Sequence, residues 1–443
     1  MKWLIAILIF SLLIIFHEFG HFIFAKINGV EVEEMSLGYG PRLLSTTFHG
    51  TRYSLKLILF GGSCLMKGMY EEYADESDHE PVAKVPEEGS FESVSLGRRA
   101  SIIFAGPFFN FLLAFIRAIV VISVVGYDPP EILNVEKSSP AAEAGLTDGD
   151  TITNFMGDGV EIGRDVSTWF LLNNLDKDEA VTMSFRHDGQ EKTVTFTPSV
   201  LTRYMLGLTY TIESETAKIQ SVSDNSPLAS AGIAAGDVIT EINGTKITTA
   251  KSLSEYFSDH PMDGSSVHIV YERDGLSYDA DVTPVKNESV DLGFSYNLGR
   301  VNTSALGVLK YSLIEIRYWI VTTVRSLGAL FTGRFSVNDL SGPVGIVDVV
   351  GTTYEETKSE GALMTWMNMI NLVILLSANL GVMNLLPIPA IDGGRLLFII
   401  IEAIRGKPMN KKVESTVQLV AVALLMMLMV YVMYHDITKI LAP

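Results

Sequence analysis

The stretch Phe16-His17-Glu18-Phe19-Gly20-His21 decides how the rest of this sequence is interpreted. It lies inside an apolar run from Trp3 to Ile27, and the residues from Leu4 to Phe16 carry no charge. On a helix, His17 and His21 are one turn apart on one face, so their imidazoles can bind one Zn²⁺. Glu18 can then act as a general base toward water. Polar residues at an interfacial helix end are the alternative, but three ionisable groups at membrane depth need a shared reason.

The composition is typical of a membrane protein with a large water-exposed insert. The chain has 443 residues, of which 48% are apolar, and a net charge of −18. The apolar residues gather near 3–25, 101–125, 305–331, 363–401 and 413–434, whereas 127–300 resembles an ordinary soluble protein. About 20 apolar residues are enough to cross a bilayer. The acidic balance argues against a nucleic-acid partner, because phosphate recognition needs a basic face.

These runs predict a polytopic α-helical membrane protein with about four transmembrane helices. The run 305–331 is interrupted by charged residues, including Lys310 and Arg317, which favours an amphipathic helix at the membrane interface. The second run contains Asn110, which should face the helix bundle, with packing as the first interpretation and support of the site as the second. The N-terminal run is expected to remain attached, because it lacks a cleavage site before His17.

A second polar cluster interrupts the apolar run at 363–401. Pro387 and Pro389 must break a helix there, and broken backbone at membrane depth is tolerated only where it is buried or lines a cavity. Asp392 follows the break, as either a third metal ligand or the cap of a helix that begins near Gly393. We favour the ligand, because the two histidines need a partner.

A membrane-associated β-hairpin is predicted between the first two runs. Arg42–Thr47 and Arg52–Phe60 flank a turn at His49-Gly50, and Gly61-Gly62 should end the hairpin. Its exposed edge could pair with an extended peptide, or the hairpin could be purely structural. The single cysteine, Cys64, excludes an intramolecular disulfide, and a buried thiol is favoured over a metal ligand.

The middle of the chain contains an internal repeat. Ser139–Thr153 recurs as Ser226–Thr240, and each copy is followed by two strands across an Asp-Gly turn. The repeated Ser-Pro…Ala-Gly…Gly-Asp pattern resembles bacterial PDZ domains. That resemblance implies two compact, β-rich, PDZ-like domains whose grooves take an extended peptide or chain end. Domains that only pack or act as a size barrier are the alternative.

The predicted organisation has five parts. They are a first membrane core at 1–126, PDZ-like domains at 127–211 and 212–290, a connector with the amphipathic helix at 291–362, and a second membrane core at 363–443. The loop that contains Arg405, Lys407, Lys411 and Lys412 should be cytoplasmic by the positive-inside rule. Both termini and the insert are then extracytoplasmic, and the candidate site lies toward the cytoplasmic side.

The motifs in combination resemble a known family. His17-Glu18-x-x-His21, Asn384-x-x-Pro387-x-Pro389-x-x-Asp392-Gly393 and inserted PDZ domains are similar to site-2 proteases, the intramembrane zinc metalloproteases. Two PDZ copies resemble the bacterial regulator of sigma-E protease in particular. The resemblance implies that His17, His21 and Asp392 hold zinc and that Glu18 activates water. Asn384 and the Pro387–Pro389 segment would contact substrate, and Gly61-Gly62 with the hairpin would bind it as an added strand.

The same resemblance implies a substrate class and a location. The substrates would be single-span membrane proteins already trimmed outside, such as an anti-sigma factor, and remnant signal peptides in addition, in a bacterial inner membrane. A non-proteolytic PDZ scaffold with a structural metal site is the main alternative, and a metal transporter is a third. Glu18 favours the protease, because neither a structural site nor a transport site needs a general base.

Overall fold

The computed structural model describes residues 2–69, 87–212 and 214–441, and the chain divides into two compact units. The first unit comprises Met1–Pro129, Ser167–Leu172 and Leu298–Ala442 and contains the long helices. The second comprises Pro130–Val166 and Asn173–Asn297 and is rich in β-strands.

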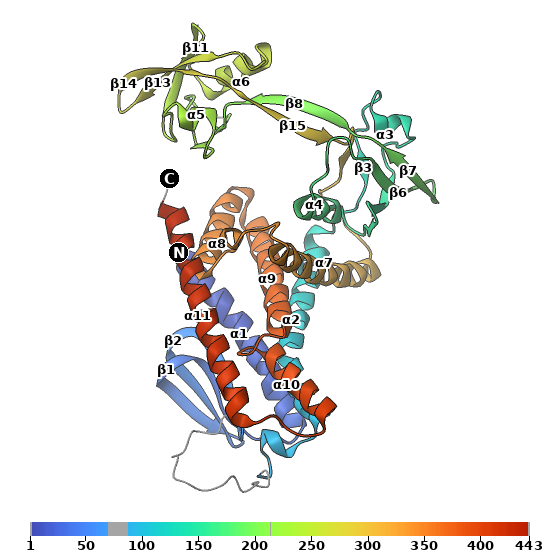
Figure 1. Ribbon diagram of the computed structural model, residues 1–443, viewed down its shortest axis with the longest axis vertical. Helices are drawn as coiled ribbons and strands as arrows, with labels where there is room; N and C mark the ends of the chain where they lie inside the picture. Colours follow the sequence, from blue (N-terminus) through green and yellow to red (C-terminus); the bar gives the residue numbers. More distant parts are fainter. Residues whose placement is uncertain (1, 70–86, 213, 442–443) are drawn as a thin grey trace. The chain divides into compact units, whose positions relative to one another are not determined.

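Four helices of the described chain are long and apolar enough to cross a membrane, in agreement with the predicted number of about four. They are α1 (Lys2–Ile27), α2 (Leu96–Val125), α9 (Ala362–Leu385) and α11 (Lys411–Leu441). Figure 1 shows α1, α2 and α9 side by side. The predicted amphipathic segment is helix α7 (Ala305–Phe331), which packs on α2 and α9 and is not one of the four. The predicted connector also contains α8 (Pro343–Thr357).

The predicted break in the apolar run at 363–401 is confirmed. Helix α9 ends at Leu385, and α10 (Asp392–Arg405) begins seven residues later, after the segment with the two prolines. The chain folds back so closely that a Cβ on Gly393 would lie 2.0 Å from the carbonyl oxygen of Leu386. A Cβ on Gly394 would lie 2.3 Å from that of Ile388, so this turn requires two glycines.

The predicted hairpin is larger than the sequence suggested. Strand β1 (Val32–Phe48) pairs with β2 (Thr51–Met66), which continues through Gly61-Gly62 instead of ending there. Leu37 pairs with both Gly62 and Leu55, so the first half of β1 lies between the two halves of β2. This fold is possible because β1 bends at Gly38 and Gly40, which both have positive φ. The β1–β2 sheet lies beside α1 (Figure 1).

In the second unit, one repeat copy is inserted into the other. The first copy forms the sheet β5-β4-β6-β7, and the second forms β12-β11-β13-β14. The predicted strand pairs are present as β6 (Val181–His187) with β7 (Gln190–Phe196), and β13 (Val267–Arg273) with β14 (Leu276–Val282). The remaining strands of these sheets are β4 (Thr151–Phe155), β5 (Asp158–Gly159), β11 (Val238–Ile242) and β12 (Thr245–Lys246).

Two long strands connect the copies. The chain leaves the first copy through β8 (Ser199–Met205) and returns through β15 (Val285–Asp291), which pairs with β8 along its length (Figure 1). It then forms β16 (Ser295–Tyr296), which pairs with β3 (Ile132–Leu133) of the first copy. The predicted order of two consecutive copies therefore needs correction, because a strand beyond residue 290 completes the first one.

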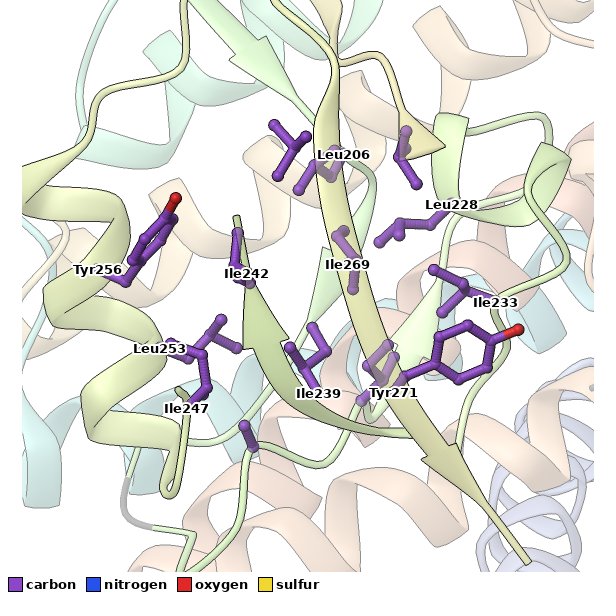
Figure 2. Packing of buried hydrophobic residues seen from close by; sticks show 14 residues of the cluster. Leu206, Leu228, Ile233, Ile239, Ile242, Ile247, Leu253, Tyr256, Ile269 and Tyr271 are labelled. Atoms are coloured by element: carbon purple, nitrogen blue, oxygen red, sulfur yellow. The ribbon is translucent and has the colours of Figure 1, made fainter. Parts of the chain in front are cut away.

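The hydrophobic core of the second copy also indicates that this domain begins earlier than predicted. Leu206 is 2% exposed and packs with Leu228, Ile239 and Ile269 in this core (Figure 2). Leu208, in strand β9 (Leu208–Thr209), packs against the same cluster, and β9 pairs with β10 (Ser221–Val222). We therefore propose that the second domain begins at Leu206 instead of residue 212.

Helices at matching places in the sequence show that the two repeat copies are equivalent. Ser139 and Ser226 cap the short helices α3 (Pro140–Glu143) and α5 (Pro227–Ser230). Gly293 and Gly207 have positive φ, and a Cβ on either would lie 2.3 Å from the Cβ of the matching serine. Longer helices, α4 (Gly163–Leu172) and α6 (Ala250–Asp259), follow at matching places. The repeated Ser-Pro stretch thus holds a glycine loop in both copies.

An ion pair between a buried glutamate and an exposed arginine braces the bend of the β1–β2 sheet. Glu34 is 6% exposed, and Arg42 donates from Nε to its Oε1 at 2.8 Å and from Nη2 to its Oε2 at 2.9 Å. This guanidinium holds the pKa of the Glu34 carboxyl at about 2, against an ordinary value of 4.5. The lowered pKa means that the charged pair contributes stability above pH 4.5, and that this contribution disappears as the pH falls toward 2.

Acidification should therefore loosen this sheet. Between pH 4.5 and 2, residues 32–66 of the wild type should lose hydrogen-exchange protection, after correction for the intrinsic exchange rate. Glu34→Gln lacks the titrating carboxylate, so its protection should be lower at neutral pH and nearly flat across this window. Parallel profiles for the two chains would show that the ion pair does not stabilise the bend.

Candidate metal centre

The structure brings together the three ligands predicted from distant parts of the sequence. The Nε2 atoms of His17 and His21 are 3.2 Å apart, and the Oδ2 of Asp392 lies 3.1 Å from the first and 3.3 Å from the second. Both histidines are buried, at 8% and 6% exposure. Among the described residues, this is the group of three or more candidate ligands whose atoms converge, within 4.8 Å of one another.

Local structure explains how each ligand reaches the site. His17 and His21 lie one turn apart on α1, so both rings leave the helix on one face. Asp392 is the first residue of α10, directly after the proline-containing break. The residue before the helix, Ile391, makes no side-chain cap, and the Asp392 carboxylate points at the imidazoles. The ligand interpretation of Asp392 is therefore favoured over the cap.

The arrangement fits a divalent metal ion such as Zn²⁺. Ligand atoms about 2.0–2.2 Å from a tetrahedral metal are themselves about 3.3–3.6 Å apart, slightly more than the three spacings here. Asp392 Oδ2 is buried and makes no hydrogen bond of good geometry within the described chain, although both rings are near. A buried carboxylate oxygen without a hydrogen bond is costly unless a cation compensates it. Two nitrogens and one oxygen are also a donor set that zinc accepts.

Helix α2 leaves space for this site through one glycine. A Cβ on Gly106 would lie 2.3 Å from Nε2 of His21 and 2.7 Å from Cε1 of His17. Any other residue would push into the space between the imidazoles. Gly106 therefore has a direct role in shaping the centre.

Helix α2 also supplies hydrogen-bond partners to the outer ring nitrogens. His21 Nδ1 lies 2.9 Å from the carbonyl oxygen of Ile102, and His17 Nδ1 lies 3.1 Å from Nδ2 of Asn110. Packing was the first interpretation of Asn110, and the structure corrects it, because this fully buried side chain contacts a candidate ligand. Its spacing of four residues from Gly106 is the signal that could have revealed it. Asn384 also reaches His17 Nδ1, at 3.4 Å from its Nδ2.

Glu18 lies at the wall of a cavity of about 420 Å³. The cavity is lined by Ile15 from α1 and by residues of β1 and β2, which include Leu37, Leu44 and Leu55. A Cβ on Gly62 would lie 3.4 Å from Cγ of Glu18, so the middle of β2 passes directly beside this carboxylate. The Tyr39 hydroxyl donates to the Gly62 carbonyl at 2.9 Å, and its ring covers Gly61. The hairpin glycines are thus close to the candidate base.

Cys64 is not part of the metal group. Its side chain is buried in a cluster with Ala25, Val30 and Ile102, and burial raises the pKa of its thiol to about 12. A thiol with so high a pKa stays protonated and is a poor ligand. This agrees with its interpretation as a buried structural thiol.

An ion pair holds α10 in place against α2. Arg99 donates to the Glu402 carboxylate through both terminal nitrogens, at 2.7 and 3.1 Å. Because Asp392 begins α10, this bidentate pair helps to fix the helix that carries the third ligand. Glu402 is thereby engaged away from the candidate ligand group.

A helix able to cross a membrane that holds two buried histidines and a glutamate beside them, with an aspartate brought against both imidazoles, defines an intramembrane metallohydrolase. The profile of Peptidase family M50 matches residues 5–428. The chain therefore belongs to peptidase family M50, and it is an integral-membrane zinc metalloprotease.

Curated relatives match the chain over almost its full length. The zinc metalloprotease RasP of Bacillus licheniformis is 31% identical, with 98% of this chain and 98% of that protein covered. The regulator of sigma E protease of Haemophilus influenzae is 28% identical, with the same coverage of both chains. A solved PDZ domain of HtrA3, bound to a phage-derived ligand, covers 20% of this chain at 18% identity with a TM-score of 0.17. That last likeness is too slight to bear on the arrangement of this chain.

Filling the space beside the imidazoles should abolish tight metal binding. In Gly106→Ala, the new Cβ overlaps His21 Nε2, so zinc affinity should fall at least about tenfold, in the range seen when a ligand is disturbed. Gly97→Ala is the control on the same helix, because its Cβ would have no neighbour within 4 Å. Zinc per chain and competition with a chelator measure the effect. Equal affinities for the two variants would contradict the role of Gly106.

Proposed function

We propose that this protein hydrolyses peptide bonds in the transmembrane segments of single-span membrane proteins. His17, His21 and Asp392 hold Zn²⁺, and Glu18 is the general base. The supporting observation is the convergence of two Nε2 atoms and one buried carboxylate oxygen within 4.8 Å, with both histidines on a helix long and apolar enough to cross a bilayer. A binding scaffold would not need a glutamate next to this group.

Each residue of the site would have a distinct role in peptide-bond hydrolysis. Zinc, when bound, acts as a Lewis acid and brings the pKa of water to about 7. His17, His21 and Asp392 would hold the ion through two imidazole nitrogens and one carboxylate oxygen. Glu18 takes a proton from the attacking water and can deliver it to the leaving amine nitrogen. The walls of the cavity beside Glu18 include Ile15, Leu37, Leu44 and Leu55, which suit the apolar side chains of a membrane segment.

A transmembrane substrate must unwind before it can be cut, because the carbonyls of a helix are hydrogen-bonded internally. The Gly62–Met66 part of β2 pairs with Val32–Leu37 on one side, and it passes next to Glu18. Its other edge is placed to accept an extended substrate as an added strand, which replaces the lost hydrogen bonds. Asn384, beside His17, and the Pro387–Pro389 segment would then contact the substrate backbone close to the site.

The substrate class and location follow from the relatives and the charge pattern. A relative is named as a regulator of sigma E protease, which supports an anti-sigma factor as substrate, and remnant signal peptides are a second class. The two PDZ-like domains would bind peptide ends exposed by earlier trimming. Basic residues between α10 and α11 support a cytoplasmic loop in a bacterial inner membrane. Both termini and the PDZ-like domains would then be extracytoplasmic, with the site toward the cytoplasm.

Removing the general base should stop cleavage and leave the metal in place. Glu18→Gln keeps the size of the side chain but cannot take a proton, so cleavage of a reporter with one membrane span should fall by about 10²–10⁴-fold. Zinc content should stay at the wild-type level. Glu33→Gln changes an exposed glutamate of β1 and should cleave normally. Full cleavage by a zinc-loaded Glu18→Gln chain would refute the mechanism.

The third ligand can be tested by metal content alone. Asp392→Asn replaces the anionic oxygen with a neutral amide, and His21→Ala removes one imidazole. Both changes should lower zinc affinity by at least about tenfold, measured by chelator competition on the full chain in detergent. Wild-type zinc retention by Asp392→Asn would remove this carboxylate from the ligand set.

A further inference from the structure

One face of α2 contacts the outer side of both imidazoles. Ile102, Gly106 and Asn110 are spaced four residues apart, so they lie in a row along the helix. Ile102 meets His21 Nδ1 through its carbonyl oxygen, Gly106 leaves space between the rings, and Asn110 meets His17 Nδ1 through its side chain. Asn110 is 0% exposed. A fully buried amide on the outer nitrogen of a candidate ligand calls for a reason beyond packing.

The reason lies in which nitrogen of each imidazole ring carries the proton. Both rings direct Nε2 toward the ligand group, so a neutral imidazole that binds through Nε2 carries its proton on Nδ1. At His21, this proton is donated to the Ile102 carbonyl at 2.9 Å. At His17, the nearest side-chain atom of Asn110 is the amide nitrogen, at 3.1 Å, which is itself a donor. The Nδ1–H of His17 and the Nδ2–H of Asn110 would then face each other as two donors, which is repulsive.

The oxygen of the Asn110 amide is also in an unfavourable position. Its Oδ1 is buried and has no hydrogen-bond partner within the described chain. The oxygen and nitrogen of a side-chain amide are told apart only by their hydrogen bonds. Turning the amide over places Oδ1 opposite His17 Nδ1, so that an acceptor meets a donor.

We propose that Asn110 is a positioning residue for His17, whose Nδ1–H donates to the Asn110 side-chain oxygen. This inference rests on the proposed function, because it takes His17 as a metal ligand. The α2 row then treats the two ligands alike: a main-chain oxygen holds His21 and a side-chain oxygen holds His17. Each contact fixes the tautomer and the ring plane. Losing such an outer partner typically lowers metal affinity by about 10–100-fold.

Two substitutions at this position separate an oxygen acceptor from mere packing. Asn110→Asp keeps an oxygen and removes the amide nitrogen, so zinc affinity should stay within about threefold of the wild type or become tighter. Asn110→Leu keeps the approximate volume without an acceptor, so affinity should fall about 10–100-fold. Affinity is measured by chelator competition on the full chain in detergent. Asn371→Leu is the matched control on α9, because this amide also has a buried oxygen without a partner and should leave affinity unchanged.

A spectroscopic measurement tests the tautomer directly. With ¹⁵N-labelled histidine, zinc-loaded wild type and Asn110→Asp should show a protonated Nδ1 for His17, assigned by its disappearance in His17→Gln. In Asn110→Leu this signal should shift or broaden, while the His21 signal should not. A merely structural role would move neither.

The outcomes are distinguishable. Wild-type affinity in Asn110→Leu overturns the proposal, and an equal loss in Asn110→Asp shows that the amide nitrogen is the contact, which overturns it as well. All measurements can be repeated in Glu18→Gln, so failure of the proposed cleavage reaction does not affect them. Failure of the proposed ligand set would appear instead as wild-type zinc binding that is insensitive to Asp392→Asn.

Discussion

The structure depends on one electrostatic constraint, the burial of the Asp392 carboxylate between two imidazoles. An anionic oxygen without a hydrogen bond at this depth is strongly unfavourable, and a bound cation removes the penalty. The three helices that surround this carboxylate must therefore be held together. Helix α1 supplies the rings, α10 supplies the carboxylate, and α2 supplies the outer contacts and joins α10 through the Arg99–Glu402 pair. The proline break before α10 is a consequence, because it aims the chain back toward α1.

Small residues make this close approach possible. A Cβ on Gly20 would lie 2.3 Å from the Ala105 carbonyl oxygen, and one on Gly381 would lie 2.6 Å from the ring of Phe111. Gly20 thus lets α1 approach the backbone of α2, and Gly381 lets α9 approach the ring of Phe111 on α2. Van der Waals packing of this kind replaces the hydrophobic effect as the force between helices in lipid.

The second unit is joined to the helices in a way that tolerates a large insertion. Because the second repeat copy is nested in the first, the chain enters and leaves the unit through neighbouring strands, β3 and β16. On the helical side, Tyr127 and Val301 pair through their backbones, so α2 and α7 can follow each other almost as if the insert were absent.

The sequence by itself determined the motifs whose chemistry is local. The spacing of His17 and His21, the prolines before Asp392 and the apolar runs predicted the ligands, the break and the number of spans, because helix geometry and bilayer thickness follow from residue type. Tertiary structure alone decided the features that depend on chain reversal or contact at a distance. These are the doubled pairing of Leu37, the nesting of the repeat copies, and the place of Asn110 against His17. Their physical cause is close packing between segments far apart in sequence, which leaves no periodic pattern in either segment.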